Sequence, residues 1–196
     1  MQIVPVWKRV TPELKAELLA FWQRNHAMAE GERSERAEQA VCVGRDESGE
    51  ICCVGTAFVA VLPRLQQPMY YYRQFFAESQ RGQKQTVPFF NRCRETLQAY
   101  NASLPAPEAL GVLVELESNL LATYYTRAYI PQADSTFIGY SPRGLQLRVS
   151  YFEGAMLLPP VPRSAPVRAI RSAAMPAAVQ EQASSDQGSR HAAENE

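Results

Sequence analysis

The chain has 196 residues, and its 20 basic and 20 acidic side chains leave no net charge at neutral pH. Hydrophobic residues make up 46% and charged residues 20%, a composition typical of folded globular proteins. Zero net charge gives no overall attraction to nucleic acid or to an anionic membrane, and no apolar stretch reaches the roughly 20 residues of a membrane span. We therefore expect neither a nucleic-acid nor a membrane partner. The first residues lack the features of a signal peptide, which predicts a cytoplasmic protein.

Hydrophobic periodicity and turn residues divide most of the chain into strands and helices. In chain order, the pattern predicts a strand at 3–10, a helix at 11–26, a short helix from about 34, strands at 40–46, 51–62 and 68–76, a helix at 86–100, a strand at 111–118, a helix at 119–129, and strands at 137–140 and 145–152. Thr11 is the predicted cap of the first helix, followed by Pro12 at its first position. Helices that interrupt a mostly antiparallel sheet predict a mixed α/β, α+β-like fold with about six to seven strands and about four helices.

The composition changes after Phe152, beyond which there is no aromatic residue. Alanine, serine, proline, glutamine and charged residues dominate the end of the chain, and they cannot bury enough apolar area to offset the entropy of ordering. We predict one folded domain at 1–157 and a disordered tail at 158–196.

The cysteines and histidines argue against disulfides and metal sites. Cys42, Cys52, Cys53 and Cys93 lie in apolar runs without C-x-x-C spacing, so we expect free, buried, reduced thiols. Two histidines, one of them in the predicted tail, cannot build a usual metal site, and no metal is predicted.

A short basic loop lies between the aromatic strand at 68–76 and the helix that begins near Thr86. Gly82 would let the backbone approach a ligand closely, while Arg81 and Lys84 add positive charge. A helix N-terminus has unpaired N–H groups that stabilise an anion. Because Pro88 is tolerated only in the first helical turn, the helix should start near Thr86, with Thr86 as its cap. The pattern predicts a phosphate-binding turn, and the alternative is a structural loop that contains a glycine.

Two carboxylates share one face of the apolar strand at 111–118. Glu115 and Glu117 need partners there, and Glu117 lies nearer the strand's C-terminal end. Glu117 could act as a general base or bind a substrate ammonium group. The alternative is a salt bridge to an arginine on a neighbouring strand. The tyrosines and Arg73 of the strand at 68–76 could line a groove for a partly apolar, carboxylate-bearing acceptor, or could simply pack against helices.

The element order resembles that of the GNAT superfamily, the GCN5-related N-acetyltransferases, over residues 1 to about 155. Two stretches carry the resemblance, QFFAESQRGQKQ (74–85) and LVELESNLLATYYTRAYI (113–130). In that family a Q/R-x-x-G-x-G/A loop follows the fourth strand and holds the pyrophosphate of coenzyme A with its N–H groups. An Asn and a Tyr that often serves as general acid follow the fifth strand. Here the loop motif departs from the family at Ser79, its first position, and at Lys84, its last.

The resemblance implies an acyl-CoA-dependent N-acyltransferase that uses acetyl-CoA and acts by direct transfer in a ternary complex. The acceptor would be an amine-bearing small molecule or protein, and a homodimer is compatible with it. Tyr125 would protonate the departing thiolate, with Tyr124 as the alternative donor, and Glu117 is the second predicted catalytic residue. The residues implied in coenzyme A binding are Phe75, Phe76, Arg81, Gly82, Gln83, Lys84 and Asn119. The alternative function is a catalytically inactive binding module with a GNAT-like fold.

Overall fold

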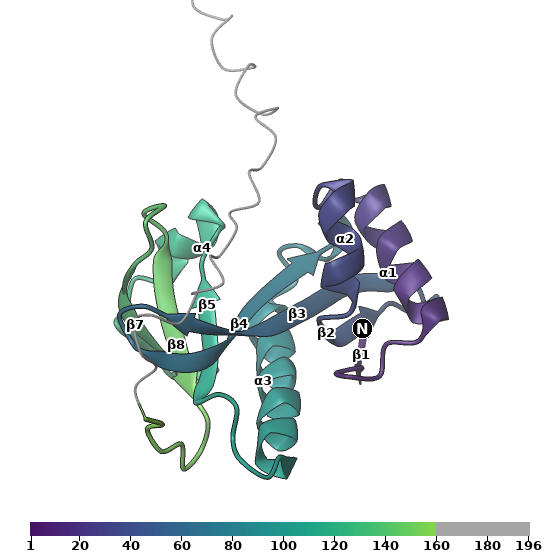
Figure 1. Cartoon of the computed structure of the whole chain (residues 1–196). Coiled ribbons are helices and arrows are strands. Elements are labelled where there is room, and N and C mark those ends of the chain that lie inside the picture. The colour runs from purple at the N-terminus through teal and green to yellow at the C-terminus, as the bar shows by residue number, and fades with distance from the viewer. Residues whose placement is uncertain (160–196) are drawn as a thin grey trace, which may run out of the picture.

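The computed structural model describes residues 1–159, so the predicted tail at 158–196 lies almost entirely outside the described residues. The strands are β1 (Gln2–Pro5), β2 (Ala40–Arg45), β3 (Ile51–Leu62), β4 (Gln67–Phe76), β5 (Gly111–Glu115), β6 (Tyr129–Ile130), β7 (Ser135–Tyr140) and β8 (Gln146–Tyr151). The helices are α1 (Pro12–Arg24), α2 (Glu30–Ala37), α3 (Thr86–Ser103) and α4 (Asn119–Tyr124), with single 3₁₀ turns at Glu78–Gln80 and Pro131–Ala133 (Figure 1).

The strands form a single sheet in the order β1-β2-β3-β4-β5-β8-β7-β6. Every neighbouring pair is antiparallel except β4 and β5, which run parallel at the centre of the sheet. The predicted mixed α/β class and four helices are confirmed. The sheet has eight strands where six to seven were expected, because the two-residue strand β6 is too short to leave a periodic signal in the sequence.

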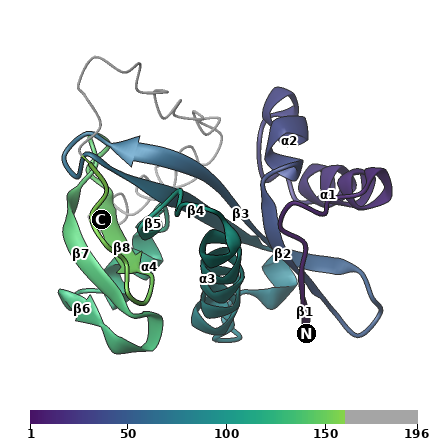
Figure 2. The ribbon, with the colours of Figure 1, turned by 60° about the horizontal axis from the view of Figure 1, so that its bottom comes forward.

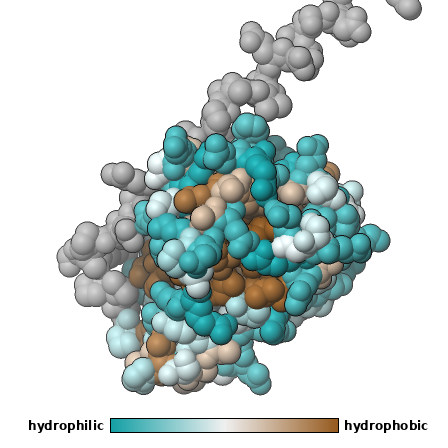
Figure 3. Space-filling view, turned by 90° about the vertical axis from the view of Figure 1, so that its right-hand side faces the viewer, coloured by the Kyte–Doolittle hydropathy of each residue, from teal (hydrophilic) through white to brown (hydrophobic). Residues whose placement is uncertain are grey.

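Helices lie on both faces of the sheet, and alternate strand residues supply the hydrophobic clusters of each face. On one face α3 packs through Phe89, Cys93 and Leu97 on β-strand residues that include Tyr70 and Tyr72. On the other face α1 and α2 pack on the β1–β3 half of the sheet. Figure 3 views the molecule from the α1 and α2 side, where mostly hydrophilic residues surround a central group of hydrophobic ones. The four cysteines are free and buried, as predicted.

The central strands β4 and β5 part after a short paired stretch. Tyr70–Tyr72 pair with Val112–Val114, and β4 then continues to Phe76 without β5 beside it. Because β5 ends at Glu115 and the chain turns into α4, a gap opens between the two strands. Figure 2 shows α3 crossing the sheet beside β4 and β5. This divergence places α3, α4 and the ends of two strands around one region.

Several predicted element boundaries were wrong. The first strand ends at Pro5, and Lys8 has a positive φ of 59° that turns the chain toward α1. The second helix starts at Glu30, before the expected position. The last helix ends at Tyr124, not at Tyr129, because Tyr129 pairs with Thr136 of β7 to form β6.

The N-termini of α1 and α3 follow the sequence to different degrees. Thr11 caps α1 as predicted, since its Oγ1 accepts a hydrogen bond from the Leu14 amide at 3.3 Å. Helix α3 begins at Thr86 with Pro88 in its first turn, also as predicted. Thr86 is not the cap, however, because Gln85 occupies that position and makes no side-chain cap bond. Within residues 1–159, no helix has the length and apolar character needed to cross a membrane.

Candidate functional site

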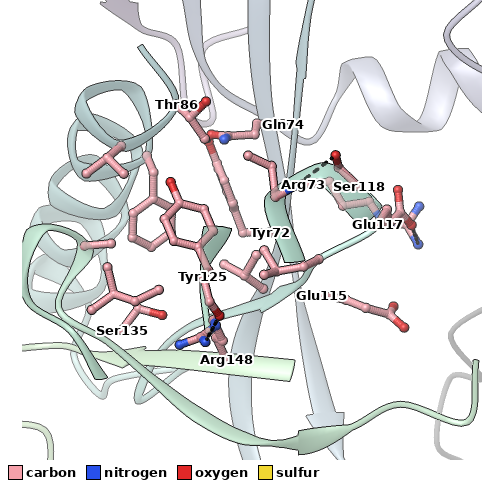
Figure 4. Close-up of a pocket in the computed structure, with 17 residues that line it drawn as sticks. Tyr72, Arg73, Gln74, Thr86, Glu115, Glu117, Ser118, Tyr125, Ser135 and Arg148 are labelled. Carbon is pink, nitrogen blue, oxygen red and sulfur yellow. Dashed lines mark hydrogen bonds and ion pairs between the residues drawn. The ribbon is translucent and has the colours of Figure 1, made fainter. Parts of the chain in front are cut away.

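A cavity of about 190 Å³ lies where β4 and β5 part, between the first turn of α3 and α4 (Figure 4). Its walls come from β4, β5, β8, α3, α4 and the segment before β7. The lining residues are Tyr72, Arg73, Gln74, Thr86, Val87, Phe90, Val114, Glu115, Leu116, Glu117, Ser118, Leu121, Tyr125, Ile130, Ala133, Ser135 and Arg148. The wall therefore combines apolar side chains with charged arginine and glutamate residues.

The loop before α3 presents unpaired backbone amides at one end of this cavity. The amides of Gln80 and Arg81 bond within the 3₁₀ turn, to Ala77 and Glu78. In the described part of the chain, the amides of Gly82–Val87 donate to no backbone carbonyl. The first turn of α3 carries no acidic side chain, so its partial positive charge is not neutralised locally. This end of the cavity is suited to an anion.

Positive φ angles at two residues shape the same loop. Gly82 has φ +79°, in the left-handed region that glycine adopts without strain, and no heavy atom lies within 4 Å of where a Cβ would stand. Lys84, at the position where the family motif has a small residue, has φ +56° and an exposed side chain. The backbone thus turns twice before α3, whose first two residues, Thr86 and Val87, line the cavity.

The side chains predicted to bind coenzyme A mostly support the loop in this structure. The Arg81 Nε donates to the Phe76 carbonyl at 3.4 Å, and its guanidinium lies 5.7 Å from the centre of the Phe75 ring. The Gln83 Nε2 donates to the Ser79 carbonyl at 2.9 Å. The main chain of this segment, more than its side chains, is available to a ligand.

The two phenylalanines and the asparagine of the predicted set lie outside the cavity wall. The Phe75 ring packs on Phe21 of α1, and the Phe76 ring packs on Phe89 of α3. Asn119 is the exposed first residue of α4, whose cap is Ser118, with Oγ accepting from the Leu121 amide. The roles predicted for these three residues stay predictions.

Tyr125 is the tyrosine that the fold places in the cavity. It occupies the C-cap of α4, is half-buried and lines the cavity between α3 and β8. Burial raises the pKa of its hydroxyl, partly offset by the Arg148 guanidinium, so the phenol stays protonated at neutral pH. Its neighbour Tyr124 is 74% exposed and is not among the lining residues.

The two predicted carboxylates differ in environment. The Glu115 side chain is only 4% exposed, and it accepts hydrogen bonds from the Tyr71 hydroxyl at 2.5 Å and Arg143 Nη2 at 2.7 Å. Burial alone would raise the pKa of Glu115, but these hydrogen bonds, led by that from Arg143, hold it below the usual value. Glu117 is half-exposed, 3.0 Å from Arg143 and 3.9 Å from Arg73 of β4, the neighbouring strand. Glu117 therefore lies at the open end of the cavity in an ion-pair network.

Removing Arg143 should destabilise the fold, because it leaves the buried Glu115 carboxylate with only the hydroxyls of Tyr71 and Ser141 as partners. We expect Arg143→Met to lower the free energy of unfolding at pH 7 by about 2–3 kcal/mol, less than for a fully buried pair because Arg143 is accessible to water. A carboxyl whose folded pKa is depressed stabilises the fold above its unfolded pKa, and that stabilisation is lost as the pH falls through the folded value. The deficit should therefore shrink in acid.

Urea unfolding at pH 7 and at successively lower pH measures this effect. The control is Arg92→Met, which breaks an exposed ion pair with Glu95 at 3.2 Å and should change stability by at most about 0.5 kcal/mol. Equal losses in both variants, or a deficit that grows in acid, would contradict the assignment.

Arg148 is the main cavity residue that was not predicted from the sequence. It lies on β8, is 3% exposed and lines the cavity beside Tyr125 and Ser135. A signal was present in QLRVSY, residues 146–151, where a polar residue at every second position marks one face of a strand that is otherwise apolar. Strand alternation indicates a polar face, but it does not say what that face adjoins.

Within residues 1–159, no group of three or more histidine, cysteine, aspartate or glutamate side chains is arranged to hold a metal ion. The polar groups of the cavity come from arginine, glutamate, tyrosine, serine, threonine and glutamine. Their chemistry is that of proton transfer and anion binding.

No protein-family model and no curated protein matches this sequence significantly. Solved structures do match. An acetyltransferase of the GNAT family from Streptococcus pneumoniae superposes with a TM-score of 0.54 at 12% identity, covering 77% of this chain and 98% of that chain. GCN5 from Tetrahymena superposes with a TM-score of 0.48 at 8% identity, covering 80% of this chain and 100% of that chain. On its similarity to the pneumococcal structure, the chain has the fold of the GNAT superfamily of acetyltransferases.

Proposed function

We propose that this protein is an acyl-CoA-dependent N-acyltransferase that transfers the acyl group directly to an amine in a ternary complex. One observation carries the proposal: the cavity where β4 and β5 part brings together the amino end of α3, Tyr125 and Glu117. These three parts supply an anion site, a proton donor and a carboxylate. Acetyl-CoA is the proposed acyl donor, the acceptor is an amine on a small molecule or protein, and the cytoplasmic location stays a prediction.

The thioester would enter from the loop before α3. The free amides of Gly82–Val87 and the α3 dipole would hold the pyrophosphate, as helix N-termini hold phosphate groups elsewhere. Beyond Tyr72, the strand residues 73–76 have no β5 residue paired with them, and this free main chain would bond the pantetheine arm like an added strand. The thioester would then lie in the cavity near Tyr125.

The chemistry needs no covalent enzyme intermediate. The amine loses a proton to Glu117, directly or through water, and its nitrogen attacks the thioester carbonyl carbon. The carbon–sulfur bond breaks, the departing thiolate takes the proton of the Tyr125 hydroxyl, and the second proton released by the acylated nitrogen restores the phenol. The raised pKa of Tyr125 keeps that proton on the phenol until the thiolate forms. The ion pair with Arg143 orients Glu117 at the cavity mouth.

A second candidate is a catalytically inactive binding module with the same fold. The observation that favours it is the loop itself, because Arg81 and Gln83 are bonded back onto the protein and Lys84 replaces a small residue of the family motif. A loop used in this way can be purely structural.

Titrating the protein with acetyl-CoA by calorimetry at two salt concentrations separates the two candidates. An acyltransferase should give saturable binding that weakens at higher salt, because part of the affinity comes from charge on the phosphates. S-acetylpantetheine, which has the thioester but no pyrophosphate, is the matched control ligand and should bind much more weakly. Absence of heat and of a thermal shift at millimolar acetyl-CoA would favour the binding module.

A further inference from the structure

Among the residues that the structure describes, the buried cation Arg148 has no counter-charge. Its Nη2 donates to the carbonyl oxygens of Tyr125 at 2.6 Å and Arg127 at 2.9 Å, and its Nε donates to Gln146 Oε1 at 3.3 Å. The buried Nη1 has no hydrogen-bond partner in the described part of the chain. No carboxylate among residues 1–159 forms an ion pair with this guanidinium. Arginines are almost never this deeply buried unless an opposite charge accompanies them.

The sheet register places Arg148 on the cavity side. Tyr72 of β4 lies opposite Val114 of β5, which in turn lies opposite Arg148 of β8. Residues directly opposite on neighbouring strands share a face, so these three form a row beneath α3 and α4 at the level where β4 and β5 part. With strands about 4.8 Å apart, the row is roughly 10 Å long. Figure 4 shows Arg148 next to Tyr125 and Ser135, across the cavity from Thr86 and Gln74.

The two arginines of the cavity wall are not equivalent. Arg73 lies at the open end, where Glu117 is 3.9 Å away. Arg148 lies opposite Val114 of β5, and its guanidinium is 6.0 Å from the centre of the Phe137 ring. A poorly hydrated guanidinium with an unused nitrogen in such surroundings attracts an anion strongly, and its planar fork matches a carboxylate.

We propose that Arg148 binds a carboxylate carried by the ligand of this cavity, and that the acyl group of the thioester carries it. The inference rests on the proposed function, which puts the sulfur beside the Tyr125 hydroxyl. Arg148 is bonded to the main-chain carbonyl of Tyr125, at the other end of that residue from its hydroxyl, and both residues line the cavity, so an acyl chain that extends from this sulfur along the cavity toward β8 approaches Arg148. The donor would then be the coenzyme A monothioester of a short dicarboxylic acid. An acceptor amine with its own carboxylate offers the same chemistry, and a separate measurement distinguishes it.

The first measurement compares four ligands by calorimetry on the full chain: coenzyme A, acetyl-CoA, malonyl-CoA and succinyl-CoA. We expect at least one dicarboxylic thioester to bind 10-fold or more tightly than acetyl-CoA. Arg148→Gln keeps an amide donor but removes the charge, and it should abolish this preference. Arg148→Lys should keep part of it. Arg127→Gln, which removes an exposed arginine nearby that does not line the cavity, is the control and should keep all of it.

The second measurement tests the acceptor as the source. With saturating acetyl-CoA, turnover of β-alanine is compared with that of propylamine, which has the same amine without the carboxylate. A 10-fold preference for β-alanine that is lost in Arg148→Gln would support carboxylate binding by Arg148 and assign the carboxylate to the acceptor. If Arg148→Gln does not fold, the wild-type preferences and Arg148→Lys decide.

Two results would overturn the inference. In the first, coenzyme A and acetyl-CoA bind, but neither measurement shows a preference for a ligand with a carboxylate. This result would not contradict the proposed function. The other is a preference that Arg148→Gln retains in full. Failure of coenzyme A and of all three thioesters to bind would instead overturn the proposed function, and the inference with it.

Discussion

Replacing Tyr125 by phenylalanine is expected to lower acyl-transfer turnover by roughly 10- to 10⁴-fold, with little change in acetyl-CoA affinity. The ring and its packing remain, and only the hydroxyl that would protonate the departing thiolate is lost. Because burial raises the pKa of this hydroxyl, the wild-type phenol is a proton donor across the neutral range. Steady-state kinetics together with calorimetric titration of acetyl-CoA separate the two effects.

Tyr124→Phe is the matched control for this experiment. Tyr124 is the preceding residue, carries the same group and is 74% exposed outside the cavity, so its variant should keep wild-type turnover. Full activity in Tyr125→Phe would end the assignment of Tyr125 as the proton donor. A loss in Tyr124→Phe alone would transfer the role to Tyr124.

Replacing Gly82 by valine is expected to abolish measurable acetyl-CoA binding. A β-branched side chain at φ +79° strains the backbone. The loop should therefore rearrange, and the amides of Gly82–Val87 should leave the positions that they have in the wild-type loop. The added side chain would also stand where the phosphates approach. Arg81→Ala should weaken binding less, by about 1–2 kcal/mol, because an exposed charge–phosphate contact is screened.

Gly49→Val separates loss of the site from loss of stability. Gly49 has φ +85°, has no heavy atom within 4 Å of where a Cβ would stand, and lies in the β2–β3 hairpin outside the cavity wall. The same backbone strain should lower stability by a similar amount, about 1–2 kcal/mol, in both variants. Only Gly82→Val should lose acetyl-CoA binding in calorimetry. Equal binding by Gly82→Val and wild type would place the cofactor elsewhere.

The elements that could be predicted are those with a strong local signal. Helix α1 has apolar residues at helical spacing behind a Thr-Pro start, and β3 has a long apolar, β-rich run, so each was recognisable without knowledge of its neighbours. The start of α3 was also predictable, because Pro88 is tolerated only in a first turn. The end of α4 could not be predicted from the sequence. Tyr129 pairs with Thr136 of β7, and the carbonyls of Tyr125 and Arg127 accept hydrogen bonds from Arg148, about 20 residues away along the chain, so contacts outside the segment decide where the helix ends.

The residues of the candidate site also separate into those that the sequence indicated and those that only the structure revealed. Glu117 and the loop around Gly82 were predicted from local patterns in the sequence, and Tyr125 was predicted from the resemblance to the GNAT superfamily. Only the tertiary structure decided that Tyr125 enters the cavity while Tyr124 does not, and that Arg148 lies in the same cavity. The physical reason is that burial and charge pairing depend on which strands become neighbours. Here the insertion of β8 beside β5 is a long-range pairing that local periodicity does not specify.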